Sequence, residues 1–145
     1  MCEENNALNT ERNNISRYKK REQAFILCFE SLFSDADIDE LADNAGDARD
    51  EFLSDYAIDC VKGIKAHQTE IDEKIACNLK SGWKITRISK VSLAIMRVAI
   101  YEMFYLEDIP VSVSINEAVE LAKKYTVEDD TAFVNGVLGA VAKTL

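Results

Sequence analysis

The feature that most constrains the fold is a run of 16 almost entirely apolar residues, Val91–Leu106, whose only charged members are Arg97 and Glu102. A helix that crosses a membrane needs about 20 consecutive apolar residues, so this run is too short and too charged to do so. A helix that is apolar on nearly every side is instead buried by neighbouring helices. We therefore expect a central helix at about Ser89–Glu107, inside a globular all-α protein.

Further helices are predicted on both sides of this one, because apolar residues recur there three and four positions apart. Strand-like alternation is confined to Val111–Ser114. A Ser114–Glu117 capping box predicts one helix start, Thr69 and Gly82 mark the two ends of another helix, and Pro110 is expected to end the central one. The expected helices begin at Ser16 and then cover about 38–44, 50–67, 69–82, 89–107, 114–125 and 133–141.

The length of 145 residues fits a single domain of about seven helices. Residues 1–15 are polar and show no periodicity, so we expect a flexible N-terminal tail followed by an all-helical domain over 16–145. Residues 1–10 lack the apolar core of a signal peptide, which predicts a cytoplasmic protein. Gly136 and Gly139 lie inside the last helix, where each costs about 1 kcal/mol relative to alanine. We expect another backbone to come close to them.

The residue types that carry enzyme chemistry are sparse. The chain has one histidine, His67, and four widely spaced cysteines, with no CxxC pair and no phosphate-binding or nucleophile motif. We expect His67 to be a solvated surface residue, and Cys28, Cys60 and Cys77 to be buried as small hydrophobes. The sequence therefore predicts no catalytic residue, no metal site and no cofactor.

The net charge of −9 is unevenly distributed along the chain. Residues 30–59 contain eleven acidic residues and one basic residue, whereas 17–21 contain four cations and 80–97 contain five cations and no acid. An acidic protein can therefore still present a basic face to a polyanion.

The basic cluster at 17–21 falls in the first turns of a predicted helix, where cations are mildly unfavourable because the helix dipole is positive. The same helix end offers free N–H groups that suit a phosphate. This pattern fits RNA binding, and it also fits a solvated charge run. Phe29, Trp83 and Phe133 could stack on unpaired bases, but we expect each of them to belong to the core.

Five segments, in this order, resemble the NusB family of transcription antitermination factors. They are SRYKKREQA (16–24), MRVAIYE (96–102), IP (109–110), INEAVELAK (115–123) and FVNGVL (133–138), and the resemblance covers about residues 16–143. It implies a NusB-like fold of two packed three-helix bundles without enzymatic activity.

The resemblance also implies partners. Members of the family bind the boxA element of ribosomal RNA transcripts together with NusE, a ribosomal small-subunit protein. With other Nus factors on RNA polymerase they suppress Rho-dependent termination.

Carried over residue by residue, the resemblance assigns basic RNA contacts to Arg17 and Arg21, and places Phe133 and Asn135 in the FVNG motif beside the RNA. Asp129, in the loop before that motif, matches an acidic position that shapes the same face. Ile26 and Phe29 stand where the family often has glutamine and tyrosine, which puts polar contacts from these places in doubt. The predicted RNA-binding residues are Arg17, Lys19, Lys20, Arg21, Phe133 and Asn135.

A second hypothesis fits the same sequence. A helical protein–protein adaptor without direct RNA binding would use the acidic face of residues 30–59 to meet a basic partner. A monomer and a homodimer both fit these features.

Overall fold

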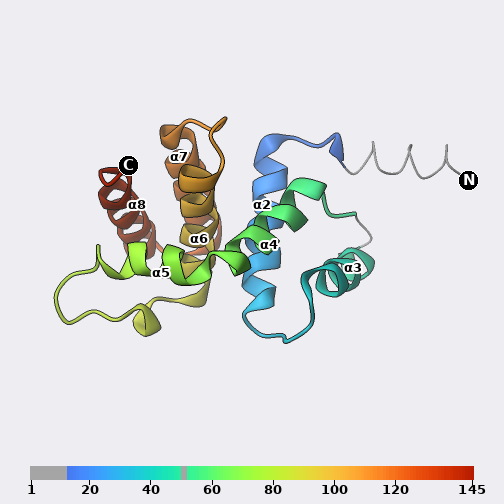
Figure 1. Ribbon diagram of the computed structural model, residues 1–145, viewed down its shortest axis with the longest axis horizontal. Helices are drawn as coiled ribbons and strands as arrows, with labels where there is room; N and C mark the ends of the chain where they lie inside the picture. The colour runs from blue at the N-terminus through green and yellow to red at the C-terminus, as the bar shows by residue number, and fades with distance from the viewer. Residues whose placement is uncertain (1–12, 50–51) are drawn as a thin grey trace, which may run out of the picture. The chain divides into compact units, whose positions relative to one another are not determined.

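The computed structural model describes residues 13–49 and 52–145. These residues form seven α-helices and one 3-10 helix (Figure 1). The predicted all-α fold of about seven helices is confirmed, and the described residues contain no strand. The elements are α2 (Arg17–Ser31), α3 (Ile38–Arg49), α4 (Asp55–Ala66), α5 (Gln68–Ala76), η1 (Ile85–Arg87), α6 (Lys90–Tyr105), α7 (Val111–Tyr125) and α8 (Glu128–Ala142).

The chain divides into two compact units, residues 1–62 and 63–145. In the first unit, α2 packs against α3, and the apolar face of α2 is buried through Ala24, Leu27 and Cys28. Asn13 belongs to the predicted tail, and it exchanges two hydrogen bonds with Asp55, the first residue of α4. Residues 1–12 of that tail lie outside the described residues.

The second unit is built around α6. This helix contacts α5, α7 and α8, and every residue from Ser92 to Ile100 is buried. The predicted central helix is therefore confirmed. Burial on most sides follows from its composition, since an all-round apolar helix is stable only where other helices cover it.

The predicted start of α7 is wrong. The helix begins at Val111 after an N-cap at Pro110, so Ser114 lies inside the helix and is buried. A proline at a helix start loses nothing by lacking an N–H, because that donor would have no partner there. The central helix had already ended at Tyr105, five residues before Pro110.

Further helix boundaries differ from prediction. Thr69 does not cap α5, which begins at Gln68 after His67. The same helix ends at Ala76, and Gly82 instead adopts a positive φ of 85° in the turn that follows. α3 continues through Gly46, beyond its predicted end. α8 already begins at Glu128, so Asp129 lies in its first turn and not in a loop before it.

The expected reason for the glycines of the last helix is also wrong. A Cβ built at Gly136 or at Gly139 would meet no atom within 4 Å. The close approach occurs at Gly63 in α4, where a Cβ would overlap the ring and hydroxyl of Tyr101.

Among the cysteines, Cys28 and Cys60 are buried as predicted, whereas Cys77 is exposed. Phe52, predicted on the apolar stripe of a helix, precedes α4 and is 60% exposed. Within residues 13–49 and 52–145, no helix is both long enough and apolar enough to span a bilayer.

Candidate nucleic-acid interface

The first part of the predicted interface is the N-terminal end of α2. Ser16 caps the helix, because its hydroxyl accepts a hydrogen bond from the backbone N–H of Lys19 at 3.1 Å. The first turn contains no acidic residue that would offset the positive end of the dipole. This helix end therefore combines free N–H groups with side-chain cations, which favours an anion.

The four cations of this helix end do not share one environment. Successive residues of a helix are about 100° apart, so Arg17, Lys20 and Arg21 lie within one arc while Lys19 lies on another side. Arg17 is exposed and Lys20 is half-buried. Lys19 forms an ion pair with Glu22 at 3.2 Å. Of the three cations on the shared side of the helix, Arg21 is just 5% exposed. Arg17 and Lys20 are therefore the two that an anion can reach.

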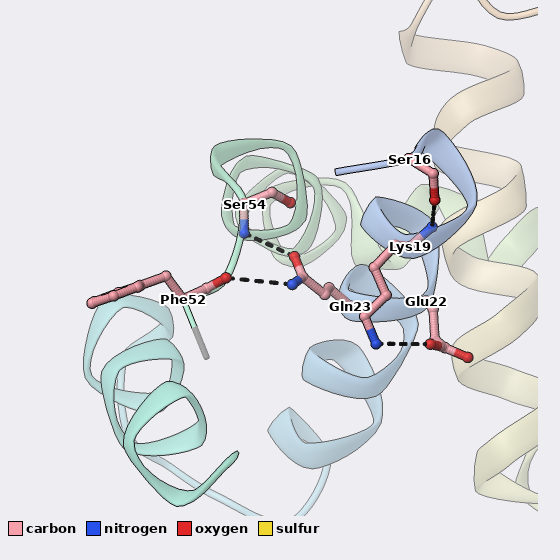
Figure 2. Close-up of polar contacts among 6 residues, drawn as sticks. All are labelled: Ser16, Lys19, Glu22, Gln23, Phe52 and Ser54. Atoms are coloured by element: carbon pink, nitrogen blue, oxygen red, sulfur yellow. Dashed lines mark hydrogen bonds and ion pairs between the residues drawn. The ribbon is translucent and has the colours of Figure 1, made fainter. Parts of the chain in front are cut away.

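The side chain of Gln23 holds α2 in place within the first unit. Its oxygen accepts a hydrogen bond from the backbone N–H of Ser54 at 2.8 Å, and its amide nitrogen donates to the carbonyl of Phe52 at 3.4 Å (Figure 2). Ser54 in turn accepts from the N–H of Ala57 in the first turn of α4. The buried amide thus ties α2 to the start of α4.

The second part of the predicted interface is α8, in the other unit. Phe133 is half-buried and Asn135 is exposed. The two side chains are about 200° apart around the helix, and Val134 between them is fully buried. The structure therefore places Phe133 and Asn135 on opposite edges of the buried stripe of α8, so one flat ligand cannot touch both.

A groove of about 530 Å³ lies between α8 and the segment that follows α5. The ring of Trp83 faces that of Phe133, with centroids 5.8 Å apart and planes 30° apart. Trp83 is 48% exposed, so its predicted place in the core is wrong. The groove is lined by Asn78, Leu79, Lys80, Trp83, Asp129, Ala132, Phe133, Gly136 and Val137.

The basic stretch 80–97 divides into surface and buried cations. Arg97 is buried, and its guanidinium donates two hydrogen bonds, at 2.9 and 2.8 Å, to the carboxylate of Asp72. It therefore stabilises the fold and adds nothing to a basic face. The exposed cations of the stretch are Lys80, Lys84, Arg87 and Lys90.

Neither the groove nor the role of Trp83 in lining it was predicted from the sequence. The signal was present: the chain's one tryptophan lies in a basic connection between two helices, next to Gly82. That position favours a surface aromatic over a core residue, because loops run over the protein surface.

Comparison with known proteins identifies the family. A model of the NusB family matches residues 18–143. The chain belongs to the NusB family. Transcription antitermination protein NusB of Clostridium botulinum (strain Kyoto / Type A2) is 45% identical over 141 residues, which cover 86% of this chain and 98% of that protein. The NusB of Acetivibrio thermocellus is 55% identical over 89 residues, 61% of each chain.

Solved structures show the same fold. Thermotoga maritima NusB has a TM-score of 0.77 at 32% identity, with 89% of this chain and 92% of that one covered. A structure of the antitermination factors NusB and NusE in complex with double-stranded RNA has a TM-score of 0.77 at 28% identity, covering 90% and 100%. The NusB-like fold and the assignment to a family of antitermination factors that are not enzymes are thus confirmed.

Proposed function

We propose that this NusB-family chain binds boxA-type single-stranded RNA of ribosomal RNA transcripts together with NusE. With other Nus factors on RNA polymerase, the complex suppresses Rho-dependent termination. The observation that carries the proposal is the basic, acid-free N-terminal turn of α2 in a chain that belongs to this family. A homologous NusB forms a complex with NusE and double-stranded RNA, which supports NusE and an RNA as partners here.

Arg17 and Lys20 are the phosphate contacts of the proposed site, because they are accessible and lie on one side of the helix end. Lys19 contributes less, since Glu22 already neutralises its charge. Arg21 is buried, so its proposed role is to stabilise α2. Arg21→Ala would therefore lower the stability of the fold before it affected RNA binding.

Phe133 and Asn135 are proposed to contact bases or sugars from α8. They face different edges of that helix, so they serve different nucleotides of one strand. Unpaired bases can be stacked on aromatic rings and read along their edges, whereas a duplex hides them. The RNA is therefore expected to bind as a single strand.

The test is a salt titration of RNA binding in the presence of NusE. For single strands, log K falls with log salt at a slope near −0.7 per phosphate contact. Removing both contacts, with Arg17→Ala and Lys20→Ala, should weaken binding and flatten the slope by about 1.4. The matched control is Lys65→Ala plus Lys143→Ala, which removes two exposed cations elsewhere and should leave the slope unchanged.

An unchanged slope in the Arg17/Lys20 variant would place the phosphate contacts elsewhere.

A second function, the protein–protein adaptor, is favoured by the acidic residues of α3, such as Asp39 and Glu40 in its first turn. That function predicts a complex with NusE that no RNA strengthens.

A further inference from the structure

The groove beside Trp83 contains Phe133, one of the predicted RNA contacts, together with residues outside that set. We infer that it holds one unpaired nucleobase, stacked on the exposed surface of Trp83, while Lys80, which also lines the groove, contacts the adjoining phosphate. This inference rests on the proposed function, since it adds a base site to the RNA path.

The ring geometry decides where the base stacks. Stacked nucleotides rise roughly 3.4 Å each, so a base between two rings would need their centroids about 7 Å apart. The centroids of Trp83 and Phe133 are 5.8 Å apart, which leaves no room between them. A base therefore stacks on the 48% of Trp83 that is exposed, and Phe133 packs against the same ring.

The charges around the groove favour a nucleotide with its base inside and its phosphate outside. Asp129 lines the groove, and its carboxylate repels a phosphate that would enter. Lys80 also lines it, and Lys84 and Arg87 are exposed within the next seven residues. Lys80 attracts the RNA backbone beside the groove, and Lys84 and Arg87 add positive charge to the same segment of the chain.

The residues that α8 contributes to the groove include small ones. Ala132 and Gly136 line it, and a Cβ at Gly136 would meet nothing within 4 Å. A flat ring can therefore approach the helix backbone. The same space means that a side chain introduced at Gly136 fills the groove without disturbing the core.

The first experiment uses Trp83 as its own reporter, because it is the only tryptophan of the chain. A single-stranded boxA-type RNA should quench its fluorescence in a saturable titration, and inorganic polyphosphate should not. Trp83→Leu should weaken RNA binding about 5- to 100-fold, as loss of one base–aromatic stack does, and Trp83→Phe should restore most of it.

The second experiment compares Gly136→Met with Gly139→Met. Both glycines lie within α8 with open space around them, and only Gly136 lines the groove. Both variants should fold at least as stably as the wild type, because any such residue is a better helix former than glycine. Gly136→Met should bind RNA about tenfold more weakly, and Gly139→Met as tightly as the wild type.

The outcomes separate this inference from the proposed function. One outcome is RNA that binds in the presence of NusE without quenching Trp83 and with an affinity that Gly136→Met does not change. That result would refute base binding in the groove but would leave the proposed function intact. RNA that fails to bind at all would overturn both. Quenching by NusE without RNA would make the groove a protein-docking site and would also overturn the inference.

Discussion

The ion pair between Arg97 and Asp72 gives the sharpest test of the second unit. Two charge-assisted hydrogen bonds of 2.9 and 2.8 Å join them, and the side chains are 7% and 26% exposed respectively. Removing one partner of a buried pair costs about 3–5 kcal/mol, because the other charge stays buried without compensation. Asp72→Ala leaves the more deeply buried charge, so it should lower the free energy of unfolding by about 3 kcal/mol.

Arg97→Met should cost less, about 1–2 kcal/mol, because water can reach the quarter-exposed carboxylate that remains. The double variant should lose less than the sum of the two, with a coupling of about 1–3 kcal/mol. Urea unfolding followed by the fluorescence of Trp83, in the same unit, measures all three. The matched control is Lys84→Met, a surface change that should stay within about 0.5 kcal/mol.

A loss below about 1 kcal/mol for Asp72→Ala would refute the structural role of the pair. So would a larger loss for Arg97→Met than for Asp72→Ala. Arg97→Met should also leave the salt slope of RNA binding unchanged, since the buried guanidinium cannot reach a phosphate.

Three further predictions follow from buried or close contacts. Ser114→Ala should raise the free energy of unfolding by about 1 kcal/mol, measured in urea, because the buried hydroxyl finds no hydrogen-bond partner among the described residues. Gly63→Ala should lower it by about 1–2 kcal/mol despite the better helix propensity, because the methyl group overlaps Tyr101; an unchanged midpoint would contradict that packing. The pKa of Tyr105 is raised to about 12 because its hydroxyl donates to the Glu70 carboxylate, so its contribution to stability is complete below its ordinary pKa of 10.0 and is lost as the pH rises towards 12. Ultraviolet titration should find the late titration of Tyr105, and Glu70→Gln should return its pKa towards 10.

Much of the fold could be predicted because local patterns agree with tertiary packing. The run at 91–106 could only be a buried helix, and α6 is one. Ser16 was the predicted start of the first helix, and its hydroxyl caps α2. In both places the local signal had no competitor.

The predicted helix boundaries were wrong where two sequence signals competed. Ser114 and Glu117 match a capping box, but Pro110 starts the helix one turn earlier, and the serine is left buried. Gly82 was the predicted end of a helix, and Gly46 lies two residues beyond another predicted end. Of these two glycines only Gly82 has the positive φ that requires a glycine, and α3 continues through Gly46.

The site could be predicted only in part. The position of Arg17 at a capped helix start follows from sequence. The burial of Arg21 and the pairing of Arg97 with Asp72 depend on tertiary contacts that no local pattern encodes. The groove joins Trp83 to Phe133, 50 residues apart, so only the folded chain reveals it.

The central claim is that this chain binds RNA and NusE together, and one thermodynamic cycle tests it most directly. The affinity for a boxA-type single strand is measured with and without saturating NusE, and the affinity for NusE with and without the RNA. The account predicts that each partner tightens the other by the same factor, since coupled binding is reciprocal. A NusE complex whose affinity no RNA changes, with no RNA bound even at low salt, would contradict it.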